Sequence, residues 1–322
     1  MRYFVARVVQ ALIVVWAVGT LVFFMLRAVP GDPIAAMLAD VDPTAADAIR
    51  AKLGLDQPVL VQYLFWLRNT LSGDLGQSLY GSHQAVNVQI AEAVPRTVSL
   101  ALVAFLVSFT LGLSAGIISA VKKDSLLDYG FNLAAFLGIS MPSFWIGIVL
   151  IIVFAVNLRW FPAIGYKPMS AGLDQWLRYL ILPGLAVGLP FSASIARLTR
   201  SAMLEVLGQD YISLARSKGL NERRVIFRHA LRNALIPVIT VMGISLALLF
   251  SGSVVVENVF AIKGLGRVLI QSILNRDYPV VQGSILLVAV LLVFMNLAVD
   301  LLYRVIDPRI SYDYVDYTQN RA

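Results

Sequence analysis

Long runs of apolar residues alternate with polar segments along the whole chain. Spanning the hydrocarbon core of a bilayer takes about 20 mostly apolar residues in a helix. About six runs meet this requirement, and they cover residues 9–28, 98–121, 132–156, 179–199, 233–256 and 281–303. Each run is continuous instead of alternating in polarity, which favours membrane-spanning helices over barrel strands. The sequence therefore predicts an all-α, polytopic membrane protein with about six transmembrane helices.

The amino-acid composition supports this class. Of 322 residues, 59% are hydrophobic and 14% are charged, which is far from the balance of a soluble domain. The first run follows Arg2 and Arg7, as in a signal peptide. It is longer than the usual signal-peptide core of about 7–15 residues, and no A-x-A site follows it, so we interpret it as a retained span. The chain has no Cys, which excludes disulfides and thiolate metal sites.

The positions of Lys and Arg predict the orientation, because the cytoplasmic loops of membrane proteins are enriched in both. With the N-terminus inside, the inner segments include Arg197, Arg200 and a dense basic group at residues 216–232. The short outer loops then hold fewer basic residues, among them Lys167 and Lys263. We therefore expect both termini to be cytoplasmic.

The loops and spans predict four parts of the chain. They are an N-terminal segment with the first span (1–29), a periplasmic loop with short helices (30–97), a five-helix core (98–306) with a basic cytoplasmic loop (201–232), and a cytoplasmic tail (307–322). Two short helices are expected in the long outer loop, at residues 43–55 and 58–71. The second is amphipathic and aromatic, which is typical of a helix on the membrane interface. A cap over the outer mouth, or a landing surface for a soluble partner, is an equal alternative.

A search for catalytic chemistry finds little. The sequence lacks G-x-x-x-x-G-K-[ST], so the chain is not expected to hydrolyse ATP. His83 and His229 fall on opposite sides of the membrane and cannot share a metal ion. No span contains a His that could activate a serine nucleophile. We predict a protein that is not an enzyme and that holds no metal or cofactor of its own.

Ionisable residues are rare within the spans. Asp300 and Arg197 lie near the inner ends of theirs, and none lies at mid-depth. Carriers driven by protons or sodium generally need such groups in mid-membrane to bind the coupling ion. Unwound backbone can also bind sodium, so a self-contained secondary carrier stays as the alternative class. The pattern favours a transporter whose energy comes from another protein.

The basic loop has the signals of two short helices that meet at an angle. Asp210 is expected to cap a helix at residues 211–218, and Gly219 is expected to end it in a left-handed conformation. Asn221 then starts a second helix, with Glu222 in the first turn, where the helix dipole favours a carboxylate.

Three basic residues follow at helical spacing. Arg224, Arg228 and Arg232 recur every four residues and are expected on one face of the second helix. Positive charge beside a membrane can simply bind anionic lipid. A break at Gly219 between two short helices needs a further reason, so we favour a docking element for a cytoplasmic protein.

Residues 215–237 (ARSKGLNERRVIFRHALRNALIP) resemble the conserved cytoplasmic EAA loop of bacterial ABC-importer permeases. The resemblance is greatest to the branch that imports dipeptides, oligopeptides, glutathione or nickel complexes, and residues 26–33, 54–58, 73–78 and 255–279 agree with it. Gly219 stands where that family has its loop glycine, and Ala215 where it has small residues. The sequence departs from the family before Leu-Gly-Arg, where the usual Pro-Gly is missing and Lys263 precedes Gly264.

The resemblance implies an ABC importer permease fold and a multi-pass subunit of the bacterial inner membrane. Such a subunit forms the pore for dipeptides or short oligopeptides, or alternatively for nickel chelates or glutathione. It implies a second homologous permease, two ATPase subunits that bind ATP and magnesium, and a periplasmic substrate-binding protein, with membrane lipid around them and no nucleic acid. The residues that it places at the ATPase are Ala215, Gly219, Asn221, Glu222, Arg224, Arg228 and Arg232.

The sequence offers only small polar residues within the spans as candidates for lining the translocation path. Those selected are Asn132, Ser140, Ser143, Ser192, Ser245 and Ser251, with Pro142 expected to kink its span. Small polar residues in membrane helices also serve helix packing, which is the alternative for each of them.

Overall fold

The computed structural model describes residues 2–28, 54, 56–80 and 84–306. The helices are α1 (Arg2–Ala28), α3 (Val59–Leu71), α4 (Val86–Val121), α5 (Leu126–Ser140), α6 (Ser143–Leu150), α7 (Leu173–Leu207), α8 (Asp210–Ser217), α9 (Glu222–Arg224), α10 (Leu231–Val259), α11 (Leu265–Leu274) and α12 (Tyr278–Ile306). Ile151–Asn157 and Val225–Ala230 are π-helical. The helix expected at residues 43–55, His83 and the tail 307–322 lie outside the described residues, except for Gly54.

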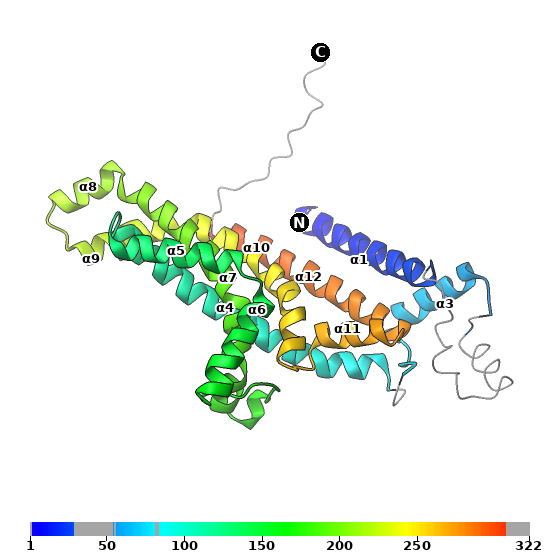
Figure 1. Ribbon diagram of the computed structural model, residues 1–322. Helices are drawn as coiled ribbons and strands as arrows, with labels where there is room; N and C mark the ends of the chain where they lie inside the picture. Colours follow the sequence, from blue (N-terminus) through cyan, green and yellow to red (C-terminus); the bar gives the residue numbers. More distant parts are fainter. Residues whose placement is uncertain (1, 29–53, 55, 81–83, 307–322) are drawn as a thin grey trace, which may run out of the picture.

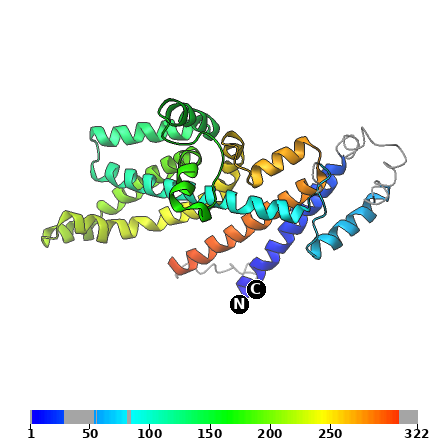
Figure 2. The ribbon, with the colours of Figure 1, turned by 90° about the horizontal axis from the view of Figure 1, so that it is seen from below.

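The prediction of about six membrane helices is confirmed. In the described part of the chain, five helices are long and apolar enough to cross a membrane, and the bent pair of α5 and α6 with its π-helical continuation makes up to six. The elements form an elongated helical array (Figures 1 and 2). The α8–α9 hairpin projects at one end, and α3 lies at the other beside the end of α1.

Helices α4 and α7 form the most closely packed pair, because glycines let their backbones approach. A Cβ built on Gly112 would lie 2.7 Å from the Ser192 carbonyl oxygen, and one on Gly188 would lie 2.8 Å from the Ala104 carbonyl oxygen. The buried Ser108 hydroxyl donates across the same contact to the Gly188 carbonyl at 2.9 Å. Small residues four positions apart are the usual means by which membrane helices pack closely. The two helices therefore pack as one body, which we call the α4–α7 unit.

Helix α4 begins earlier than the hydropathy pattern indicates. It starts at Val86 and not at residue 98. Val86, Ile90 and Ala93 share one buried face and pack with Leu265 of α11 and Val280 of α12. The polar residues between them lower the hydropathy of this stretch, although its helical period is intact. The first turns of α4 are therefore amphipathic and pack on protein.

The span expected at residues 132–156 is broken and not continuous. Helix α5 starts already at Leu126 and ends at Ser140, and α6 leaves it at an angle of 108°. Met141 is extended, with φ −92° and ψ 128°, because a residue before proline is excluded from the helical region. The expected kink at Pro142 is confirmed, and it is a sharp corner.

The predicted helix at residues 58–71 is confirmed as α3, which lies against α1. The Trp16 Nε1–H of α1 donates to the Tyr63 hydroxyl at 3.1 Å. Gly19 leaves room for the Trp66 ring, whose nearest atom would be 3.0 Å from a Cβ at that position. The aromatic face of α3 is thus turned to protein. Its Leu60 and Leu64 side chains are 69% and 64% exposed, which suits a helix whose other face meets lipid.

Candidate functional site

The basic loop is anchored by an apolar cluster at one end of α7. Ile212 and Ala215 of α8 are buried and pack with Met203 of α7 and with Val225 and Ala230 of the π-helical turn. Buried apolar positions three apart on α8 explain why so short a helix forms here. Asp210 is the first residue of α8 and not its cap; Gln209 precedes it without a side-chain capping bond. The loop is therefore fixed to the helices that continue from it.

Gly219 forms the turn between the two arms of the loop. Its φ is +79°, which confirms the predicted left-handed stop. Its N–H donates to the Arg216 carbonyl oxygen at 2.9 Å. No atom lies within 4 Å of a Cβ built on it, so the backbone conformation and not lack of space favours glycine.

Two side-chain contacts then hold the second arm. The Asn221 side-chain oxygen accepts from the Arg223 N–H at 3.0 Å, which confirms the predicted cap. Arg216 donates to both carboxylate oxygens of Glu222, at 2.8 and 3.2 Å. This hydrogen-bonded contact raises the pKa of Arg216. Since the pair links α8 to α9, it fixes the angle at which the arms meet.

The exposed side chains of the loop include both apolar and basic ones. Leu214 and Phe227 are 55% and 54% exposed. A hollow of about 490 Å³ is lined by Asn221, Arg223, Arg224 and Phe227. We call the exposed side chains of Leu214, Asn221, Arg223, Arg224 and Phe227 the α8–α9 surface. Large apolar side chains exposed among cations are suited to an apolar groove in a protein with an acidic rim.

The seven residues selected for docking are placed as follows. Ala215 is buried beneath the loop, whereas Gly219, Asn221, Glu222, Arg224, Arg228 and Arg232 are all exposed. The register assumed for the arginines does not apply, because Val225–Ala230 is π-helical and its hydrogen bonds run from i to i+5. No feature of the sequence indicates this widening. Residues four apart are therefore no longer superposed along this turn.

The polar residues selected for a translocation path come from four helices, α5, α6, α7 and α10. The Ser140, Ser192 and Ser245 hydroxyls donate to carbonyls of their own helices, at 2.7–2.8 Å. Ser143 is half-buried at the start of α6. The side chain of Ser251 lies outside those described. Asn132 donates to the Asp128 carboxylate at 2.8 Å and belongs to a polar cluster. Ser192 also lines a cavity of about 610 Å³ between α4, α5, α6 and α7.

The opposite end of the molecule has a buried carboxylate that sequence reasoning missed. Glu257 is fully buried and accepts from the Thr97 hydroxyl at 2.6 Å and from the Arg267 N–H at 3.1 Å. The Thr97 hydroxyl in turn accepts from the Leu265 N–H at 2.8 Å. A Cβ at Gly264 would lie 2.5 Å from the Glu257 carboxyl group. Glycine is therefore required at position 264, where the chain enters α11. The Gly264 of the GLGR stretch is the sequence feature that could have indicated this buried carboxylate.

A second buried carboxylate joins two segments of this end that are distant in sequence. Asp277 accepts from the Ser78 hydroxyl and, at 3.1 Å, from the Leu79 N–H. The stretches 73–78 and 255–279, noted separately in the sequence, are thus parts of one surface. Within the described residues no group of three or more His, Cys, Asp or Glu side chains could hold a metal ion.

The chain is similar to known proteins over nearly its whole length. Residues 112–312 match the family model described as the binding-protein-dependent transport system inner membrane component. Residues 1–101 match the model for the N-terminal part of such membrane components. A protein of Brucella suis biovar 1 is 47% identical over 308 residues, which are 95% of this chain and 98% of that protein.

Two further relatives have names that describe transport. The di/tripeptide transport system permease protein DppB of Pseudomonas aeruginosa is 42% identical, over 97% of this chain and 99% of its own. The oligopeptide transport system permease protein AppB of Bacillus subtilis is 40% identical, over 96% and 99%. Among solved structures, inward-facing MetNI methionine ABC transporter has a chain that is 19% identical, with a TM-score of 0.53, covering 68% of this chain and 96% of that one. That likeness is one of fold.

Proposed function

Because the chain belongs to the family of binding-protein-dependent transport system inner membrane components, we propose that it forms the pore of an ATP-driven importer of dipeptides or short oligopeptides. Membership places it in the inner membrane as a transport permease. The peptide substrate is supported by the names of relatives that are 40% and 42% identical over nearly their full length.

The α8–α9 surface supports the proposal that an ATPase subunit docks there and supplies the energy for transport. Two ATPase subunits, which bind ATP and magnesium, each receive such a surface, one from this chain and one from a second, homologous permease. The exposed Leu214 and Phe227 enter an apolar groove, and Arg223 and Arg224 meet its acidic rim. Nucleotide can shift the transporter between states only if these contacts differ between them. The anchored loop then passes the movement to α7 and α10.

The opposite end is proposed to receive the periplasmic substrate-binding protein, with both termini of the chain in the cytoplasm. Helix α4 has 36 residues and is about 54 Å long at about 1.5 Å per residue. The hydrocarbon core is about 30 Å thick, so part of α4 extends beyond it. The outer part of α4, residues 72–79 and α11 form this face, held by Glu257 and Asp277.

Reconstitution in vesicles tests the proposal. The chain is compared alone and together with its ATPase subunits, second permease and binding protein, with a labelled dipeptide, glutathione and a nickel chelate as substrates. We expect dipeptide uptake that needs ATP and every subunit. Uptake of glutathione or of the nickel chelate without uptake of the dipeptide would change the proposed substrate. Uptake by the chain alone, driven by a proton or sodium gradient, would overturn the importer and leave the α8–α9 surface as a lipid contact.

A further inference from the structure

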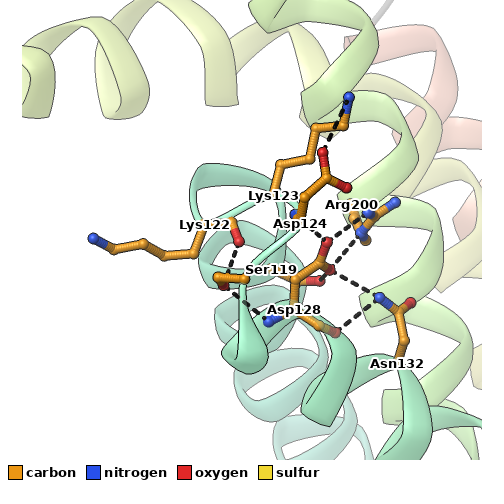
Figure 3. Close-up of polar contacts among 8 residues, drawn as sticks. Ser119, Lys122, Lys123, Asp124, Asp128, Asn132 and Arg200 are labelled. Carbon is orange, nitrogen blue, oxygen red and sulfur yellow. Dashed lines mark hydrogen bonds and ion pairs between the residues drawn. The ribbon is translucent and has the colours of Figure 1, made fainter.

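A buried ion pair joins three helices close to the α8–α9 end. Arg200 of α7 donates two hydrogen bonds to the carboxylate of Asp128 at the start of α5, both 2.7 Å long (Figure 3). The Asp128 side chain is 2% exposed and that of Arg200 is 25% exposed. The Ser119 hydroxyl near the end of α4 donates to the same carboxylate, as does the Asp124 N–H at 3.0 Å. This carboxylate therefore holds the inner ends of α4, α5 and α7 together.

The geometry of the pair is specific. The two parallel bonds between a planar guanidinium and a carboxylate fix both the distance and the orientation of the two groups. Asn132, one turn along α5, donates a further hydrogen bond to the Asp128 carboxylate at 2.8 Å. Apolar residues of similar volume often stabilise a fold as well as a buried ion pair does. What the pair adds is a defined position of α5 on α7.

Elsewhere α5 is held less closely than α4 is. Phe131 and Ala134 of α5 line the cavity of about 610 Å³ that α5 and α6 share with α4 and α7. At the far end of α5, a Cβ on Gly138 would be 3.4 Å from the Ala193 Cβ, an ordinary contact distance. By contrast, a Cβ on Gly116 of α4 would be 2.5 Å from the Thr199 Cβ of α7. The ion pair is thus the firm attachment of α5 at its inner end.

On α7 the same attachment lies next to the anchor of the docking loop. Ala202 and Met203, the second and third residues after Arg200, are buried with Ile212 and Ala215 of α8. A displacement of α8 therefore reaches Arg200 through less than one turn of helix.

Resting on the proposed function, we propose that Asp128 and Arg200 are positioning residues that make α5 follow α7 when the ATPase subunits move the α8–α9 surface. Both bonds are lost if the helices slide past each other by more than a fraction of a helical turn, because hydrogen bonds weaken steeply with distance and angle. The inner end of α5 then moves together with α7. The corner at Met141 and Pro142, which follows the other end of α5, is displaced with it. The pair thus links the ATPase side to the middle of the membrane.

The first test compares two Asp→Asn variants in the complete reconstituted transporter. Asp128→Asn removes the buried charge, whereas Asp124→Asn removes an exposed pair with Lys123, 3.8 Å long, from the same turn. We expect the amount of peptide imported per ATP hydrolysed to fall severalfold in Asp128→Asn and to stay at the wild-type value in Asp124→Asn. Equal wild-type ratios in the two variants overturn the inference.

A double variant separates positioning from stability. Asp128→Asn alone leaves Arg200 without its partner and can prevent folding. Asp128→Asn with Arg200→Gln removes both charges, so the complex is expected to assemble while import per ATP stays low. Recovery of the wild-type ratio in this double variant would show that the pair only stabilises the fold, and would overturn the inference.

A distance measurement needs no change to the pair itself. The chain has no Cys, so spin labels can be placed at Leu133→Cys on α5 and Ser201→Cys on α7, both exposed positions. We expect their separation to be the same in the nucleotide-free and ATP-trapped states, while each moves relative to Phe294→Cys on α12. A separation that changes with nucleotide overturns the link. Failure of the wild-type transporter to import would overturn the proposed function as well, whereas the outcomes above concern the link alone.

Discussion

Gly116 of α4 lies so close to Thr199 of α7 that a Cβ on the glycine would be 2.5 Å from the Thr199 Cβ. The Ala196 carbonyl oxygen would be 2.6 Å away, so backbone as well as side chain occupies the space. This contact adjoins the cavity, whose lining includes Ile118 of α4 and Ala196 of α7. The rigidity of the α4–α7 unit depends on it.

Replacing Gly116 with leucine is expected to separate the two helices. Overpacking of a close contact typically costs about 1–3 kcal/mol. We expect less folded protein in detergent and a lower midpoint of thermal unfolding. Gly130→Leu in α5 is the matched control, because no atom lies within 4 Å of a Cβ there. Equal stability of the two variants would mean that α4 and α7 can part without loss.

Gly219→Ala is expected to uncouple ATP hydrolysis from import. An L-residue in the left-handed region costs roughly 1–2 kcal/mol, and the turn can relieve it only by changing the angle between α8 and α9. The protein should still insert in the membrane, since the apolar anchor is intact. Gly208→Ala is the control, because Gly208 has φ −84°, which alanine adopts freely. The measurement is peptide uptake per ATP, and a wild-type ratio for Gly219→Ala would contradict the docking geometry.

Reversing the charge of Arg228 and Arg232 to Glu is expected to weaken binding of the ATPase subunits. Both side chains are exposed at the base of the loop, so folding should be little affected. The effect should grow at low ionic strength, because the interactions of exposed charges are screened by salt. Copurification of the ATPase subunits at two salt concentrations measures it. Lys123→Glu, an exposed charge outside the loop, should leave copurification unchanged.

Neutralising the pair of Arg216 and Glu222 should change coupling more than stability. The two side chains are 42% and 55% exposed, and an exposed ion pair contributes only about 0–1 kcal/mol. Glu222→Gln should therefore unfold at nearly the wild-type temperature while importing less peptide per ATP. A large drop in unfolding temperature with normal coupling would show that the pair acts on the fold and not on the loop angle.

Gly264→Ala is expected to disturb the face proposed for the binding protein. The new methyl group would meet the Glu257 carboxyl group and the Thr97 hydroxyl, both at 2.5 Å. Since Glu257 is fully buried, it cannot turn away into water. We expect weaker stimulation of ATP hydrolysis by the loaded binding protein, with copurification of the ATPase subunits unchanged. Loss of that copurification would indicate general misfolding instead.

The features that the sequence predicts well are those set by neighbouring residues. The left-handed Gly219, the Asn221 cap and the corner at Pro142 each follow from the chemistry of one or two adjacent residues. The long apolar runs likewise determine the number of spans. The early start of α4 is missed because its outer turns are amphipathic and their partners lie in α11 and α12.

The features that the sequence does not predict depend on residues far apart in the chain. Asp128 and Arg200 are 72 positions apart, and Thr97 and Glu257 are 160 apart. Asp128, Arg200 and Glu257 each lie near the end of an apolar run. The simplest interpretation of a charged residue at such a place is that it faces headgroups or water. The π-helical turn at Val225–Ala230 also has no local signal. Tertiary packing decides all three.

The corner between α5 and α6 has a consequence for what can surround it. A helix that stops at Ser140 leaves its last carbonyl groups without the N–H groups of a following turn, and Pro142 has no N–H to offer. Hydrocarbon cannot satisfy such groups, so irregular backbone at membrane depth is tolerated only against protein or water. The corner must therefore lie against protein or water, and Met141 packs against the buried apolar cluster of this chain. Carbonyl groups left free in this way can accept hydrogen bonds from the N–H groups of a peptide backbone, whatever its side chains.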